Sequence, residues 1–142
     1  MLGVFAVTQA TLPLLRKAPT GRIVNVPSAG GSFTLKDNPS DYSRQYVEEY
    51  QTSKTALNAV TQAFAIELEG TSIKVNAVCP GITATGPSNY APDAGSVEDA
   101  ARQPVRQAVL DANGPRRQGS GTPQVHFLGK VLCGNVSGIA EP

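Results

Sequence analysis

Tyr50 and Lys54 are the two residues of this 142-residue chain whose types and spacing best fit a chemical role. They stand four positions apart in a stretch whose larger apolar residues recur every three or four positions, which predicts a helix over residues 50–69. Four residues make about one helical turn, so both side chains should lie on one face. A cation held beside a phenol favours the phenolate, which makes the phenol usable as an acid or base near neutral pH. Alone the spacing is weak evidence, because an ordinary surface helix can carry the same pair.

Ser28 is a third candidate, because it closely follows a short β-branched strand predicted at residues 22–26. Ligand crevices in parallel sheets open where the strands end, and this strand ends in small residues. Gly30 and Gly31 should let the backbone come close to something bound there, although an ordinary exit from the strand explains the same residues. A hydroxyl, a phenol and an ammonium at one crevice would move a proton to or from a substrate oxygen.

The elements that must position these side chains alternate between helices and strands. Helices are predicted at residues 1–17, at 50–69 and from about 97, and strands at 22–26 and 72–78. This alternation predicts an α/β fold with a parallel sheet. Pro80 and Gly81 form a sharp turn after the second strand, so that this turn should lie near Ser28 at the carboxyl end of the sheet.

The helix at residues 1–17 is apolar nearly all round, which predicts a core helix covered on two sides. Pro13 should kink it or mark its last turns, and Pro104 should kink or split the helix that starts near residue 97. The helix at 50–69 has two apolar faces, so we expect two partners: the sheet, and either the first helix or a second subunit. Its stripe of larger side chains consists of Leu57, Val60, Phe64 and Leu68, and its stripe of small ones consists of Thr52, Ala56, Ala59 and Ala63.

The chain is expected to divide into a domain at residues 1–112 and an irregular tail at 113–142. The tail is rich in glycine and polar residues, and its one expected element is a last strand near 124–128. The single histidine, His126, is interpreted as a residue of that strand rather than as a ligand or a base.

The composition excludes several functional classes. The net charge is +1 and no basic stripe is present, so nucleic acid is not an expected partner. Cys79, Cys133 and His126 form no zinc-binding or disulfide pattern, so no metal site and a reduced, cytoplasmic setting are expected. The apolar N-terminal stretch is interrupted by polar residues and by Pro13, and a membrane span needs about 20 apolar residues, so no membrane association is expected.

Three ordered motifs resemble those of the short-chain dehydrogenase/reductase family. They are Gly21-Arg22-Ile23-Val24-Asn25-Val26 with Ser28 and Gly31, then Tyr50 with Lys54, then Val75-Asn76-Ala77-Val78 with Pro80-Gly81. The resemblance implies a partial Rossmann-like fold, a doubly wound parallel sheet of which only the later strands and helices are present. It also implies an oxidoreductase that interconverts a carbonyl and an alcohol by hydride transfer with NAD or NADP, which the sequence does not distinguish.

The resemblance implies a role for each matching residue. Ser28 would orient the substrate oxygen, Tyr50 would be the general acid in reduction and the base in oxidation, and Lys54 would assist Tyr50 and hold the nicotinamide ribose. The residues expected at the cofactor are Tyr50, Lys54, Asn76, Pro80, Gly81, Ile82, Thr83 and Thr85. The substrate would be a small-molecule carbonyl or alcohol, whose identity the sequence leaves open.

The chain departs from the family pattern in three ways. Pro27 precedes Ser28 where the family usually has a serine or another small residue. Tyr50 stands twenty-two positions after Ser28, which is more than is usual. The family's Gly-rich cofactor turn has no counterpart, so the chain is expected to be a truncated form that begins after the adenine-binding half.

Such a truncation would leave the strand at 22–26 with an unpaired edge. The alternative function is then a non-catalytic fragment that forms a homodimer, or pairs with an intact homologue, through the helices 1–17 and 50–69. A non-functional remnant is a third alternative.

Overall fold

A computed structural model describes residues 1–33, 48–109 and 132–133 of the chain. Its elements, in order, are α1 (Leu2–Leu15), β1 (Arg22–Asn25), η1 (Ala29–Gly31), α3 (Glu48–Glu67), β2 (Lys74–Cys79), η3 (Gly86–Ser88), α4 (Val97–Ala108) and β3 (Leu132–Cys133), of which η1 and η3 are short 3-10 helices. The three predicted helices and the first two strands are confirmed. The strand expected at 124–128, with His126, lies outside the described residues, and the division into a domain and a tail stays a prediction.

The strands form a parallel sheet in the order β1-β2-β3. Arg22 to Asn25 of β1 stand opposite Lys74 to Ala77 of β2. The chain must cross over the sheet between these two parallel strands, and α3 makes this crossover. Within the described part of the chain β1 is paired on one side only, as expected for an edge strand.

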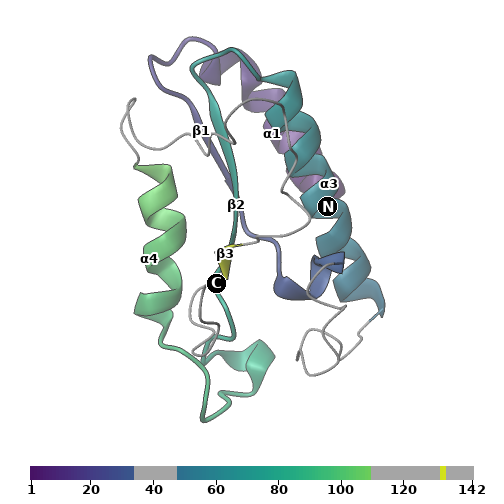
Figure 1. The fold of residues 1–142 in the computed structure, drawn as a ribbon, viewed down its shortest axis with the longest axis vertical. Helices are drawn as coiled ribbons and strands as arrows, with labels where there is room; N and C mark the ends of the chain where they lie inside the picture. Colours follow the sequence, from purple (N-terminus) through teal and green to yellow (C-terminus); the bar gives the residue numbers. More distant parts are fainter. Residues whose placement is uncertain (34–47, 110–131, 134–142) are drawn as a thin grey trace, which may run out of the picture.

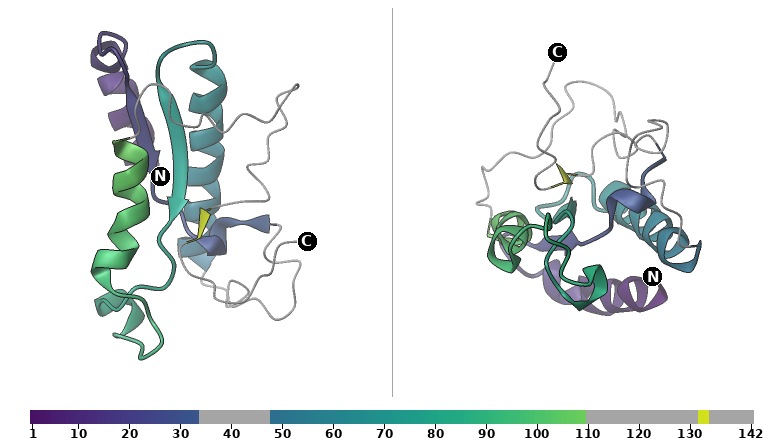
Figure 2. Two further views of the ribbon diagram at one scale, coloured as in Figure 1. Left: turned by 60° about the vertical axis from the view of Figure 1, so that its left-hand side comes forward. Right: turned by 90° about the horizontal axis from the view of Figure 1, so that it is seen from below.

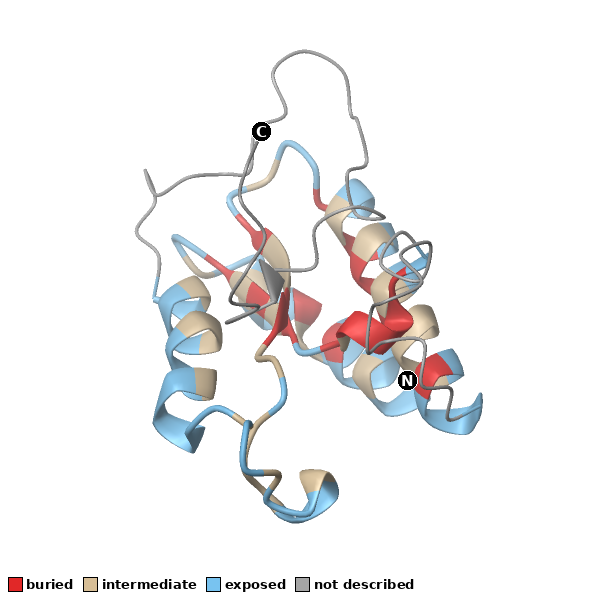
Figure 3. Cartoon of the chain, turned by 60° about the horizontal axis from the view of Figure 1, so that its bottom comes forward, coloured by how far each residue is buried: buried red, intermediate tan, exposed pale blue. Residues whose placement is uncertain are grey.

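Helices cover both faces of the sheet, with α1 and α3 on one face and α4 on the other (Figure 1, Figure 2). The core therefore lies mainly between the strands and the pair α1 and α3. It is formed by Leu12, Ile23, Phe64, Leu68 and Ile73. Figure 3 shows the buried residues gathered along the strands and η1, whereas α4 is exposed on its outer side. This arrangement is the α/β doubly wound architecture that the sequence predicts.

The expectation that α1 is covered on two sides is wrong for the described chain. Only Thr8 and Leu12 of this helix are buried, whereas Leu2 is 75% exposed and Leu14 is 68% exposed. The ring of Phe5 stacks on Phe64 of α3 at 5.6 Å between centroids, yet it also remains partly exposed. The helix contacts the rest of the described chain along one narrow strip, so its remaining apolar side chains face outward.

The two helical prolines behave differently from each other. Pro13 lies in the last turn of α1, which is one of the two outcomes that the sequence predicts. Pro104 lies inside α4, which continues to Ala108, so the helix is not split there and the alternative outcome, a kink, stays a prediction. Proline removes one backbone donor, but bonds on either side hold the helix: Ser96 Oγ caps the N–H of Asp99, and the N–H of Val109 donates to Val105.

None of the helices in the described residues has both the length and the apolarity that crossing a membrane requires.

Candidate active site

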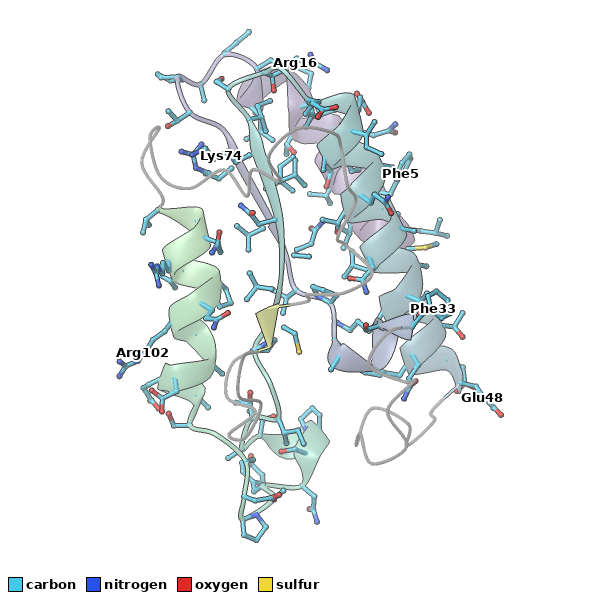
Figure 4. All side chains as sticks on the ribbon, viewed as in Figure 1. Phe5, Arg16, Phe33, Glu48, Lys74 and Arg102 are labelled. Atoms are coloured by element: carbon cyan, nitrogen blue, oxygen red, sulfur yellow. The ribbon has the colours of Figure 1, made fainter. Side chains whose placement is uncertain are left out.

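The three segments with candidate residues come together at one end of the sheet. Both long strands run in the same direction, so the exit from β1 towards Ser28 and the exit from β2 into Pro80 lie at their common carboxyl end (Figure 1). The first turns of α3, which carry Tyr50 and Lys54, lie at the same end. Figure 4 shows Glu48 at this end, whereas Arg16 lies at the opposite end of the molecule.

Ser28 is held by the turn that it begins. Its backbone is extended, and its Oγ accepts a hydrogen bond from the N–H of Gly30 at 3.2 Å, which caps η1. A hydroxyl has one proton to donate and two acceptor positions. The contact with Gly30 uses an acceptor position, so the Ser28 hydroxyl is oriented and its proton remains available to donate to another oxygen.

Tyr50 and Lys54 are neighbours on α3, as their spacing predicts. The Lys54 Nζ lies 5.5 Å from the centroid of the Tyr50 ring. At that distance an ammonium is attracted to the ring face. Tyr50 is 50% exposed, so this residue lies at the surface of the described chain.

Lys54 also joins α3 to the end of β1. Its Nζ donates a hydrogen bond to the backbone carbonyl of Val26 at 3.0 Å. Val26 stands two residues before Ser28, so this bond holds the ammonium beside the strand exit. The described residues contain no hydrogen bond between the side chains of Ser28 and Tyr50. The segments that carry them are held together by the bond from Lys54 to Val26 and by the packing of η1 on α3.

Close backbone packing fixes η1 against α3. A Cβ at Gly31 would lie 2.7 Å from the carbonyl carbon of Lys54 and 2.8 Å from the amide nitrogen of Thr55, so only glycine fits there. Asn58 Nδ2 donates to the Gly31 carbonyl at 3.1 Å and closes the contact one turn further along α3. The sequence predicts that Gly30 and Gly31 approach a bound molecule; this stays a prediction, and the structure gives both glycines a close neighbour within the chain. Their neighbour is α3 itself, because the side chain of Gln51 fills the space beside Gly30.

A buried hydrogen bond holds the middle of α3 on β1. Asn25 Nδ2 donates to Thr61 Oγ1 at 2.8 Å, and the Thr61 hydroxyl donates to the Leu57 carbonyl at 2.7 Å. Both side chains are buried, and a buried polar group without a hydrogen-bond partner lowers the stability of the fold. The bond therefore favours the one position of α3 along β1 at which the two side chains meet. Neither residue is among the site residues that the sequence predicts. The available indication was a polar residue on each apolar surface, namely Asn25 in a β-branched strand and Thr61 in line with Leu57 and Phe64.

The residues after β2 form a loop that is folded on itself. Gly81 has a φ of 82°, a left-handed conformation that favours glycine and turns the chain away from the sheet. The N–H of Ala84 donates to the Gly95 carbonyl, and the N–H of Gly95 donates to the Ile82 carbonyl. Thr83, Thr85 and their neighbours are thereby held in a compact loop at the carboxyl end of the sheet (Figure 1).

The polar groups of this loop are largely engaged with one another. Ser88 Oγ donates to the Thr83 carbonyl at 2.6 Å, and Thr85 Oγ1 contacts the same carbonyl at 3.3 Å. Thr83 Oγ1 lies 3.5 Å from the Gly81 carbonyl, a weak hydrogen bond at best. Asn76, on β2, is half-buried and stands opposite Val24. In the described ranges, no group of three or more His, Cys, Asp or Glu residues is placed to hold a metal ion.

Comparison with known proteins identifies the class of protein. The family model of the short-chain dehydrogenases matches residues 1–94. The chain therefore belongs to the short-chain dehydrogenase family, and the resemblance drawn from its motifs is confirmed.

Several relatives are reductases. The chain is 33% identical to (−)-isopiperitenone reductase of Mentha piperita over an alignment 142 positions long, which covers 76% of this chain and 44% of that protein. It is 37% identical to 3-oxoacyl-[acyl-carrier-protein] reductase FabG of Thermotoga maritima over 91 residues, which cover 64% of this chain and 33% of that protein. The chain thus spans less than half the length of the curated relatives that it matches.

Solved structures agree on the fold. Salutaridine reductase from Papaver somniferum superposes with a TM-score of 0.62 at 29% identity, over 80% of this chain and 49% of that one. Carbonyl reductase Sniffer of D. melanogaster gives a TM-score of 0.60 at 24% identity, which supports the fold alone.

Proposed function

We propose that this chain carries the catalytic half of an NAD(P)-dependent oxidoreductase that interconverts a carbonyl and an alcohol. The observation that carries the proposal is the position of the Lys54 ammonium. It lies between the Tyr50 ring and the Val26 carbonyl, at the strand exit that leads to Ser28. The reductases among its relatives support the same reaction type.

Three side chains would handle the proton. In the reductive direction the Tyr50 hydroxyl donates a proton to the substrate oxygen, and in the oxidative direction the Tyr50 phenolate removes it. Ser28, whose Oγ is oriented by Gly30, donates a hydrogen bond to the same oxygen. Lys54 would assist Tyr50, and its Nζ lies 5.5 Å from the centroid of the Tyr50 ring.

The residues present fit the nicotinamide-ribose part of NAD or NADP. An ammonium has three donors, and one of those on Lys54 already bonds Val26, so that two remain for the ribose hydroxyls. Asn76, Pro80, Gly81, Ile82, Thr83 and Thr85 would border the nicotinamide at the ends of the parallel strands. When bound, the nicotinamide supplies or accepts the hydride at the substrate carbon.

The substrate would be a small-molecule carbonyl or alcohol. A cytoplasmic setting is proposed from the cysteine usage alone.

Nicotinamide mononucleotide tests the proposal on the chain as it stands, because it contains the nicotinamide and ribose without the adenosine. Titrated into the 142-residue protein, it should shift the amide resonances of Val26, Ser28 and Lys54. Lys54→Met should weaken binding on the order of tenfold or more, since a charge-assisted hydrogen bond is lost. The matched control is Lys17→Met, an exposed lysine just after α1. Shifts confined to other regions, or equal affinities for the two variants, would contradict the cofactor site.

Turnover tests the chemistry separately. With reduced nicotinamide mononucleotide and a panel of small aldehydes and ketones, Tyr50→Phe should lower the rate about a hundredfold while leaving nucleotide affinity nearly unchanged. Tyr90→Phe, an exposed tyrosine on the loop after β2, is the control. A Tyr50→Phe protein as active as the Tyr90→Phe protein would remove Tyr50 from the proposed role.

A second candidate function is pairing through α1 and α3, with another copy or with an intact relative. Exposed apolar side chains on both helices favour it, notably Leu14 on α1 and Ile66 on α3. Sedimentation should then show a dimer that Leu14→Lys weakens and that Val105→Lys, on the exposed side of α4, leaves unchanged. A monomer at all concentrations, with no complex with a full-length relative, would exclude this function.

A further inference from the structure

Gln51 is a buried neighbour of a candidate catalytic residue. It follows Tyr50 directly on α3, yet Gln51 is 4% exposed whereas Tyr50 is 50% exposed. Consecutive residues of an α-helix are about 100° apart around its axis, so adjacent side chains leave the helix in different directions. The first turn of α3, at the carboxyl end of the sheet, therefore carries Tyr50 at the surface and Gln51 inside (Figure 1).

The Gln51 side chain supports the turn that orients Ser28. A Cβ placed on Gly30 would lie 3.2 Å from Gln51 Cδ and 3.3 Å from both its Cγ and its Nε2, so the end of this side chain lies against Gly30. The N–H of Gly30 in turn donates to Ser28 Oγ at 3.2 Å. A continuous series of contacts therefore leads from α3 through Gly30 to the Ser28 hydroxyl.

We propose that Gln51 is a positioning residue of the candidate active site: by filling the space beside Gly30 it holds the Ser28 hydroxyl in place for the substrate oxygen. It acts through Gly30 and Ser28 and does not itself touch the substrate. The inference rests on the proposed function, in which Ser28 donates to that oxygen. A group that orients a substrate loses much of its effect on the rate when it is displaced by a fraction of an ångström.

Contacts that do not involve the Gln51 side chain hold the backbone of α3 in place. Thr55 Oγ1 donates to the Gln51 carbonyl at 3.0 Å, within the helix. The backbone of Lys54 packs so closely on Gly31 that a Cβ there would overlap it. The helix should therefore keep its position when only the Gln51 side chain is shortened. The change should be local, because the support beside Gly30 is lost.

Gln51→Ala tests the positioning without any turnover. It leaves a space beside Gly30, so the Gly30 amide resonance should shift and its hydrogen should exchange on the order of tenfold faster, whereas the Leu68 amide should be unchanged. Gln51→Met fills the same space and should stay close to the wild type. The matched control is Gln9→Ala, an exposed glutamine of α1. Unchanged exchange at Gly30, or equal changes in the Ala and Met variants, would overturn the inference.

Turnover tests the catalytic consequence. With reduced nicotinamide mononucleotide and the panel of aldehydes and ketones, Gln51→Ala should lower kcat on the order of tenfold, while KM for the nucleotide stays close to the wild-type value. In a Ser28→Ala background the same substitution should have almost no further effect, because the hydroxyl that it positions is gone. Equal losses with and without the Ser28 hydroxyl would show general destabilisation and would overturn the positioning role.

The two measurements separate this inference from the proposed function. If the wild-type chain turns over no substrate, the proposed function fails, and exchange at Gly30 still decides whether Gln51 supports the turn that orients Ser28. If the wild type is active and Gln51→Ala is as active as Gln9→Ala, the proposed function stands and the positioning role is overturned. Should Gln51→Ala fail to fold, Gln51→Asn, which is one methylene shorter than the native side chain, takes its place in both measurements.

Discussion

The two halves of α3 are held by different forces. The N-terminal half packs on η1 through glycine contacts and polar bonds: Gly31 admits the Lys54 backbone, and Lys54 donates to Val26. The C-terminal half packs through apolar side chains: Phe64, and Leu68 directly after the last residue of the helix, are each 2% exposed in the core. Glycine contacts and hydrogen bonds fix positions closely, whereas apolar burial contributes more of the free energy of folding.

This difference between the two halves of α3 bears on function, because the candidate catalytic side chains all lie at the N-terminal, polar half. A substitution in the apolar half should change the stability of the whole domain. A substitution in the polar half should change the geometry around Ser28 and Lys54 at a smaller cost in stability. The following substitutions test this contrast.

Phe64→Ala should have the largest effect. It removes a buried ring that contacts both the core and Phe5, and should lower the free energy of unfolding by about 3–5 kcal/mol. Urea denaturation followed by circular dichroism measures this. Ile66→Ala, which is 56% exposed on the same helix, should stay within about 0.5 kcal/mol of the wild type. If Phe64→Ala is unfolded in water, Phe64→Leu provides a milder measurement; equal effects at positions 64 and 66 would refute the apolar half of the comparison.

Gly31→Ala should cost about 1–3 kcal/mol, because its Cβ would overlap the backbone of Lys54 and Thr55. It should also displace the amide resonances of these two residues. The matched control is Gly3→Ala in α1, where the added Cβ meets nothing within 4 Å and alanine is the better helix former. The close-packing explanation fails if Gly31→Ala is as well tolerated as Gly3→Ala.

Asn58→Ala should have the smallest effect on stability, about 0.5–1.5 kcal/mol, through loss of its bond to the Gly31 carbonyl. Hydrogen exchange should detect a local change. The amides of Gly31 and Ser32, which bond within the η1 turn, should exchange faster, whereas that of Leu68 should not. Thr52→Ala, exposed on the same helix, is the control. A uniform change along the whole of α3 would mean that Asn58 does not act locally on η1.

Much of the fold could be predicted because its signals are local. Apolar periodicity identifies α3, and the shared face of Tyr50 and Lys54 follows from helical geometry alone. The strand β3 was missed because two residues have no periodicity to detect. The apolar composition of α1 shows that its side chains favour burial, but it does not show which surface covers them.

The site was less predictable, because its geometry depends on contacts between distant residues. Gly31 looked like a ligand-binding glycine, and its actual neighbour, Lys54, is far away in the sequence. Asn25 and Thr61 are each a polar residue on an apolar surface, but nothing in one sequence pairs them. The roles proposed for Ser28, Tyr50 and Lys54 came from the family motifs, and they stay proposals until the nucleotide and turnover experiments are done.

The bond between Lys54 and the Val26 carbonyl has a consequence for the thermodynamics of ligand binding. Immobilising a lysine side chain costs about 1.5–2 kcal/mol of rotamer entropy, and here folding itself restricts it. A ligand that accepts from the other two N–H groups therefore meets a preorganised donor, and its association should show a smaller entropic penalty than binding to a flexible surface lysine. Because the acceptor is a main-chain carbonyl, this preorganisation should survive any change of side chain at position 26 that preserves the path of the strand.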